Sequence, residues 1–407
     1  MQIAMIAAQF SADEADDLRR SMAAWKRKGG VDRFHDRLVG TMVERGYDAE
    51  FAERIFSQIK GFGEYGFPES HAASFAKLVY VSCWLKCHEP ACFLAALLNS
   101  QPMGFYAPSQ LVQDARKHGV AVRAVDVTCS HWDCTMEAPL VEGALDGAKQ
   151  VLDQKLYPGI RAEQPAVRLG LRLVTGLGEK SVDRLLAARE QAAFVSVQDL
   201  ALRAQLGSVE INALAAADAL LPLAGHRRQQ VWEAAAVRPA PLLLKSVPTH
   251  EALLVLPDTP EGENILFDYQ STGLTLRRHP LALLREKLSQ KGLLTAAQLN
   301  ALPDGEEVAA CGLVTVRQQP QTAKGTVFVT MEDETGPVNV IVWKSLRQTQ
   351  RAEVMHARLL AVQGTWQRSE EQGCEKGFGA VRNLVAHRLE DFTPLLGRLG
   401  TASRDFH

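Results

Sequence analysis

The first hundred residues place apolar side chains at helical spacing, with polar residues between them. Ser11 and Glu14 form the pattern of a capping box, which satisfies free backbone amides at the start of a helix. Gly46 interrupts a second helical pattern, and Pro90 suits the first turn of a short apolar helix. We expect helices over about 11–28, 33–60, 70–89 and 91–98. The N-terminal third is therefore predicted to be mostly helical.

After Pro303 the pattern changes to alternation of apolar and polar positions, which is typical of half-buried strands. The residues at 333–336 fit a turn between two of these strands. Strands are expected over 307–316, 326–331, 338–343, 359–366 and 381–389. Five short strands in about ninety residues indicate an OB-type β-barrel.

Between these two regions the chain combines a tight glycine turn with helices. Residues 169–174 lead into Gly176-Leu177-Gly178, which is followed by helical patterns over 179–190 and 209–235. Prolines concentrate in 237–264, which predicts a linker. No long-period repeat is convincing in the sequence. Together these patterns predict a multidomain α+β protein.

Composition narrows the class of protein. A length of 407 residues suggests two to four domains, and 46% hydrophobic with 23% charged residues is typical of folded globular chains. There is no apolar run long enough for a membrane span and no secretory signal pattern, so the cytoplasm is expected. Seven cysteines without paired spacing predict reduced thiols and no metal site. A net charge of -2 excludes a globally basic DNA-binding protein, so local patches or backbone amides would have to make any DNA contact.

The glycine turn is a candidate DNA-binding site. Gly176 and Gly178 precede a helix, so their backbone amides and the positive helix end are suited to hold a phosphate, and Lys180 lies close by. The alternative is that the turn is only a helix cap. A helical second unit beside it favours DNA binding, because the pair is typical of a tandem helix-hairpin-helix region.

The predicted barrel carries a second candidate site. Alternation assigns the valines of two strands to the core, and it places Phe328 and Trp343 on the opposite face, near Arg317 and Lys324. Aromatic rings beside cations suit the stacking of single-stranded bases. The alternative, to which we give equal weight, is that both rings pack beneath a neighbouring domain.

The helical third contains weaker candidates for nucleotide binding. Arg19 and Arg20 are suited to a triphosphate, and Ser70 and His71 at a helix start are suited to a phosphate or a sugar. Solvated basic residues and a structural histidine are the alternatives. The acids at 13–17 cluster in one helical turn, as capping predicts, so we reject them as catalytic residues.

Three stretches resemble one known family, the error-prone C-family DNA polymerases of the ImuC type, which are DnaE-like relatives of the alpha subunit of DNA polymerase III. They are GEYGFPESHAASFA at 63–76, RLGLRLVTGLG at 168–178 and TAKGTVFVTMEDETG at 322–336. Their order matches the family's order of fingers, tandem helix-hairpin-helix and OB domain. The resemblance covers essentially the whole chain and is to the C-terminal part of the family's proteins. It implies the ranges 1–105 for a helical fingers portion, 106–165 for a mixed connecting region, 166–236 for the tandem helix-hairpin-helix, 237–300 for a Pro-rich linker and helix, 301–392 for the OB-fold and 393–407 for a tail.

The resemblance also implies a function. The family performs error-prone, template-directed nucleotidyl transfer in damage-induced translesion synthesis, using DNA, a dNTP and Mg²⁺, with inactive Y-family-like and RecA-like proteins as mutasome partners. Its palm aspartates, which hold Mg²⁺, would precede Met1, so this chain alone is expected to bind no cofactor and to be inactive. The alternative is a non-catalytic DNA-binding adaptor with helix-hairpin-helix and OB modules. By the resemblance, Arg19, Arg20, Ser70 and His71 would face the incoming nucleotide.

Overall fold

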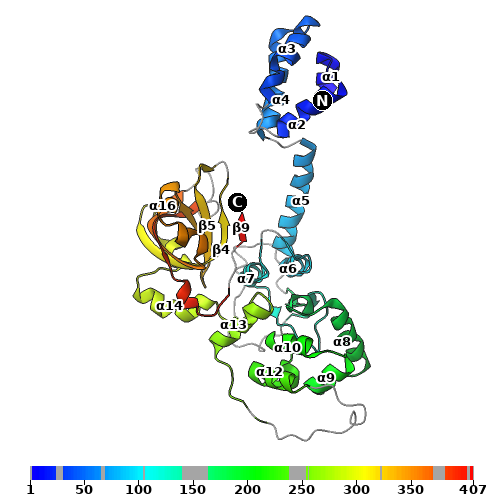
Figure 1. Cartoon of the computed structure of the whole chain (residues 1–407), viewed down its shortest axis with the longest axis vertical. Helices are drawn as coiled ribbons and strands as arrows, with labels where there is room; N and C mark the ends of the chain where they lie inside the picture. Colours follow the sequence, from blue (N-terminus) through cyan, green and yellow to red (C-terminus); the bar gives the residue numbers. More distant parts are fainter. Residues whose placement is uncertain are drawn as a thin grey trace. The chain divides into compact units, whose positions relative to one another are not determined.

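The computed structural model describes residues 2–23, 31–65, 69–103, 106–139, 164–237, 254, 256–320, 323–369, 381–400 and 404–406. The end of the first predicted helix, at 24–28, lies outside these residues. The chain divides into two compact units, Met1–Cys87 and His88–His407, and each is described by itself. Figure 1 shows the elements in chain order, from blue to red.

The first unit is helical, as the sequence predicts. Its elements are α1 (Gln2–Ala8), α2 (Ala12–Ala23), a 3-10 turn (Val31–Phe34), α3 (His35–Glu44), α4 (Ala49–Tyr65) and α5 (Glu69–His88). The capping box is confirmed, because the Ser11 amide donates to Glu14 Oε2 at 2.9 Å and the Glu14 amide donates to Ser11 Oγ at 3.2 Å. Leu18, Leu38 and Met42 are fully buried in a small core. Gly46 stands between α3 and α4, as expected.

The second unit opens with two helices on a small sheet. The helices are α6 (Pro90–Asn99) and α7 (Pro108–Lys117), and the strands are β1 (Val122–Arg123), β2 (Thr135–Glu137) and β3 (Ala166–Arg168). β3 pairs with β1 in parallel and with β2 in the antiparallel sense. One hydrophobic core runs from Ala91 to Leu274, so the predicted ranges 106–165 and 166–236 share a core.

The helical hairpin region follows in green in Figure 1. Its elements are a 3-10 turn (Leu171–Leu173), α8 (Glu179–Gln191), α9 (Val197–Arg203), α10 (Ser208–Ala216), α11 (Leu221–Ala224) and α12 (Arg227–Ala236). Beyond the proline-rich segment come α13 (Glu261–Ser271), α14 (Pro280–Gln290) and α15 (Ala296–Ala301).

The five predicted strands form a closed barrel. They are β4 (Glu307–Gln318), β5 (Val327–Glu332), β6 (Pro337–Val342), β7 (Leu359–Ser369) and β8 (Val381–Asp391). The sheet order is β5-β6-β8-β7-β4, and pairing of β4 with β5 closes it. Helices α16 (Lys344–Thr349) and α17 (Arg351–His356) connect β6 to β7, and β9 (Arg404–Phe406) pairs in parallel with β4. The predicted fold class, a multidomain α+β chain with an OB-type barrel, is confirmed.

Strand alternation places the side chains as predicted. Val327, Val329, Met331, Val338, Val340 and Val342 are all buried in the barrel core. Phe328 on β5 is 39% exposed, and Trp343, one residue beyond β6, is 53% exposed. The period of two along each strand, together with the pairing of Phe328 with Ile341, puts both rings on the outer face.

Candidate nucleic-acid interface

The predicted glycine turn, Thr175–Gly178, is here called hairpin 1. It is exposed except for Leu177, which is buried in the core and anchors the loop. Gly178 caps the 13-residue helix α8, and no side chain accepts a hydrogen bond from its first amides. Among the residues that the structure describes, the amides of Gly178, Glu179 and Lys180 have no intramolecular acceptor. These donors are therefore available to an external anion.

The two glycines of hairpin 1 serve different purposes. Gly176 has a φ of 86°, in the left-handed region that favours glycine. Gly178 has an extended backbone, with a φ of -95°, that any residue can adopt. A Cβ on Gly178 would meet no atom within 4 Å, so a side chain there would project into the space that a bound phosphate would enter.

A second hairpin, Ala204–Gly207, precedes α10 and is here called hairpin 2. It repeats hairpin 1 at an offset of 29 residues, the separation of the hydrogen-bonded pair Ser181 and Glu210. Buried apolar residues recur at this offset in the pairs Leu171 and Leu200, Leu177 and Leu206, Val182 and Ile211, and Leu185 and Leu214. The sequence showed no convincing repeat because Gln205, with a φ of 52°, replaces the first glycine. Leucine spacing around two short loops was the signal that could have revealed it.

Packing from distant segments fixes the position of hairpin 1. The Thr175 amide donates to the carbonyl of Ser271, at the end of α13, at 2.7 Å. A Cβ on Gly170 would lie 2.4 Å from the carbonyl oxygen of Trp132, so only glycine allows this close approach of two backbone segments. Arg172 spans the same junction, because it donates to Asp133 Oδ1 and to the carbonyl of Asn99, each at 2.6 Å.

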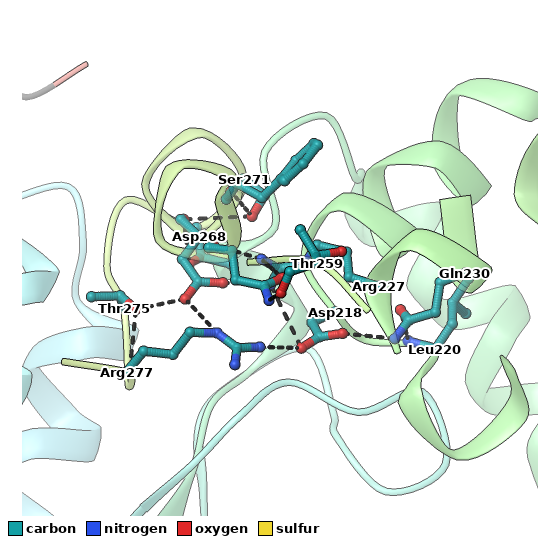
Figure 2. Close-up of polar contacts among 12 residues, drawn as sticks. Asp218, Leu220, Arg227, Gln230, Thr259, Asp268, Ser271, Thr275 and Arg277 are labelled. Carbon is teal, nitrogen blue, oxygen red and sulfur yellow. Dashed lines mark hydrogen bonds and ion pairs between the residues drawn. The ribbon is translucent and has the colours of Figure 1, made fainter. Parts of the chain in front are cut away.

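A buried ionic cluster attaches α13 to the hairpin region. Arg227 of α12 is 2% exposed, forms an ion pair with Asp268 of α13, and donates to the carbonyl of Asn264 at 2.6 Å. Figure 2 shows Arg277 lying between two carboxylates, with its guanidinium 2.8 Å from Asp218 and 3.5 Å from Asp268. Two arginines and two aspartates balance in charge. Since α13 ends at the carbonyl that contacts hairpin 1, the cluster supports the candidate site.

On the barrel, the two predicted cations, Lys324 and Arg317, lie in different environments. Lys324 is exposed in the loop before β5, with a φ of 48°. Arg317 is 6% exposed and donates through Nε to the carbonyl of Val354 at 2.7 Å and through Nη2 to that of Ala357. The expectation that Arg317 lies beside the exposed rings is wrong, because its pairing with Val329 puts it on the core side of β4. It braces α17 instead.

The predicted nucleotide-binding residues lie in the first unit. Arg19 and Arg20 are exposed on α2, and both pair with Asp16, at 2.8 and 2.7 Å. The hydrogen bond from Arg19 is the largest of the interactions that lower the pKa of Asp16. Ser70 and His71 fall in the first turn of α5, as expected, but their side chains lie outside what the structure describes. Their assignment to nucleotide binding stays a prediction.

Cysteines and acids in the described ranges do not form a metal-binding set: no group of three or more His, Cys, Asp or Glu residues there is placed to hold a metal ion. Cys134 Sγ instead accepts a hydrogen bond from the Gly170 amide at 3.3 Å, and burial raises the pKa of its thiol. The described residues therefore do not fit the Mg²⁺ expected for a complete polymerase. No helix in the described part of the chain is long and apolar enough to span a bilayer.

Two family models match this chain. Residues 119–230 match the helix-hairpin-helix motif, which includes both hairpins. Residues 1–46, which include Arg19 and Arg20, match the finger domain of the bacterial DNA polymerase III alpha subunit. The sequence predicted both kinds of module, although the helix-hairpin-helix match begins at residue 119 and the predicted range begins at 166.

The chain is similar throughout to longer curated proteins. It is 54% identical over 408 residues to "Error-prone DNA polymerase" of Burkholderia pseudomallei, matching 100% of this chain and 36% of that protein. The proteins of the same name from Bordetella parapertussis and Methylococcus capsulatus are 53% and 52% identical, with 36% and 38% of their lengths covered. The solved structure of asparaginyl-tRNA synthetase from Pyrococcus horikoshii is 19% identical over a match that covers 25% of this chain and 23% of the synthetase chain. The TM-score is 0.20, which is too low to support a common fold. The chain spans little more than a third of the curated relatives it matches.

Proposed function

We propose that this chain, which corresponds to about 36% of an error-prone DNA polymerase related to the DNA polymerase III alpha subunit, binds the backbone of duplex DNA through hairpin 1. The observation that carries the proposal is the set of amides at Gly178, Glu179 and Lys180, which have no acceptor among the described residues. They open α8 inside the matched helix-hairpin-helix region.

The chemistry of hairpin 1 suits a phosphate and carries no sequence information. The first amides of a helix point outward along its axis, and the aligned peptide dipoles give that end a partial positive charge. Lys180 is exposed in the first turn and adds a full positive charge. This charge offsets the negative charge of its neighbour Glu179. Backbone amides read only the position of a phosphate, so binding is expected to be independent of base sequence. A polymerase that copies any template requires such contacts.

The barrel supplies a second kind of contact. Phe328 and Trp343 present exposed rings on one face, and bases stack on aromatic rings regardless of their identity. Lys324 is exposed in the preceding loop and is suited to a phosphate of the same strand. We propose that this face binds single-stranded template, while hairpin 1 binds duplex.

In a protein as long as the relatives, these contacts would serve template-directed nucleotidyl transfer from a dNTP, used in translesion synthesis after DNA damage. Arg19 and Arg20 would then exchange Asp16 for the phosphates of the incoming nucleotide. Support for this part of the proposal comes from the finger-domain match and from the printed name of the relatives. Inactive Y-family-like and RecA-like proteins remain the proposed partners.

The test of duplex binding is Gly178→Val, measured by fluorescence anisotropy with a labelled duplex. A Cβ at this position meets no protein atom within 4 Å and requires no change of backbone, so the variant is expected to fold normally. It would block close approach of a phosphate, and we expect duplex affinity to fall by about tenfold or more.

The matched control is Gly400→Val, since Gly400 also has open space around its Cβ position and lies far from hairpin 1 in the sequence. The control should bind duplex as tightly as the parent. Equal affinity of the Gly178→Val variant, at an unchanged melting temperature, would contradict the proposal.

A further inference from the structure

The two hairpins share a fold but differ at the end that would face DNA. Both place a buried leucine in the loop, Leu177 or Leu206, and both end in a glycine that caps a helix with extended backbone. Because the scaffold is the same, differences at matched positions, 29 residues apart, report on function rather than on folding.

Hairpin 2 already holds an anion of its own. The Gly207 amide donates to Glu210 Oε2, so a carboxylate already binds the amide that is matched to that of Gly178. Ser181 Oγ and Arg184 Nη2 both contact Glu210 Oε1, the latter at 3.3 Å. These contacts lower the pKa of Glu210 in spite of its partial burial, so the carboxylate stays charged. In hairpin 1 the residue matched to Glu210 is Ser181, which has no carboxylate to place on the Gly178 amide.

The first turn of α10 also lacks the cation that hairpin 1 has in Lys180. Lys180, in the first turn of α8, is matched by Val209 in the first turn of α10, and Val209 is 72% exposed. An exposed valine offers nothing to a phosphate. The neighbouring exposed residue, Ser208, is uncharged.

The loop of hairpin 2 is committed to internal contacts. Arg184, from α8, donates to the carbonyls of Ala204 and Gln205, at 3.2 and 3.4 Å. Gln205 holds its positive φ without being a glycine, so a side chain stands where hairpin 1 has the bare backbone of Gly176. Hairpin 2 thus fixes the helix that carries hairpin 1.

We propose that the two hairpins are not equivalent: hairpin 1 alone contacts DNA phosphate, and hairpin 2, with Glu210 in the anion position, is an internal brace that positions α8. This inference rests on the proposed binding of duplex by hairpin 1. It predicts a one-sided contact with the duplex backbone, in place of the two matched contacts that a symmetric pair of hairpins would make.

The experiment compares Lys180→Glu with Val209→Glu in the full chain. Each variant puts one acid at the matched, exposed position in the first turn of a helix, where an acid is tolerated by the helix dipole. Binding of a labelled duplex is measured by anisotropy across a salt series, with melting temperatures as the folding control.

We expect Lys180→Glu to weaken binding about tenfold and to lower the slope of log K against log salt by about 0.9, the value for one phosphate contact. Val209→Glu should stay within about twofold of the parent with an unchanged slope, because Val209 makes no phosphate contact that the substitution could remove. Equal losses in the two variants, or a loss in Val209→Glu alone, would overturn the inference and leave duplex binding by this region in place. If neither variant loses affinity, the proposed role of hairpin 1 fails, and the inference fails with it.

Discussion

Replacing Arg227 by methionine tests whether the ionic cluster holds α13 onto the hairpin region. Arg227 is 2% exposed, pairs with Asp268 and donates to the carbonyl and side-chain oxygens of Asn264 at 2.6 and 3.2 Å. Methionine keeps an unbranched apolar stem like that of arginine and removes the charge and all of these donors. The carboxylate of Asp268 would remain buried without its main partner.

The expected loss of stability depends on the partners that the Asp268 carboxylate retains in the variant. Removing one partner of a buried ion pair costs about 3–5 kcal/mol, because the other charge is left uncompensated. Asp268 retains a hydrogen bond from Thr275 at 2.5 Å and the guanidinium of Arg277 at 3.5 Å. The Asp268 charge therefore keeps part of its compensation, and we expect a loss of stability at the lower end of that range, about 3 kcal/mol.

The adjacent Arg228 provides the control for this substitution. Its side chain is 37% exposed and lies 3.4 Å from Glu263, so it forms a surface pair with the same helix, α13. Such exposed pairs contribute about 0–1 kcal/mol. Arg228→Met is thus expected to leave stability nearly unchanged.

The assay is urea unfolding of the purified variants followed by circular dichroism. Arg227→Met should shift the midpoint of the transition that reports on the helices well below that of Arg228→Met. Equal midpoints for the two variants would refute the reasoning, since they would show that burial adds nothing to the Arg227 pair.

Three further predictions concern other parts of the chain. Gly170→Ala should lower stability by about 3 kcal/mol, because its Cβ would overlap backbone atoms. Gly178→Ala should have the melting temperature of the parent, and calorimetry of both variants tests the difference. Trp343→Ala should weaken single-stranded DNA binding about tenfold if the exposed ring stacks on a base, and unchanged binding by a folded variant would show that the ring is structural. The pKa of Glu137 is lowered, first by the hydrogen bond from Arg168, so its contribution is complete above its usual pKa of 4.5 and is lost as the pH falls through the folded value. Glu137→Gln should therefore be less stable than the parent at pH 6, and this difference should shrink at acidic pH; a constant difference in urea unfolding would argue against the pair.

The sequence by itself determined the local elements. Helix starts such as the Ser11 and Glu14 capping box, and the alternation that buries Val329 and exposes Phe328, follow from the 3.6-residue and two-residue periods of the backbone. These signals involve residues a few positions apart. The glycine turn of hairpin 1 was visible for the same reason, because it combines two glycines with a helix start.

Only the tertiary structure decided which of these residues face solvent and which partners they meet. The sequence predicted Arg317 to be an exposed cation. The register of β4 against β5 instead turns it toward the core, where it donates to two carbonyl oxygens. Hairpin 2 was hidden because Gln205 takes a backbone conformation that sequence patterns assign to glycine. Arg227 and Asp268 lie 41 residues apart, on two helices separated by the proline-rich segment. Such contacts depend on how whole elements pack against one another, and that packing is set by the combined burial of many side chains, so no local period records it.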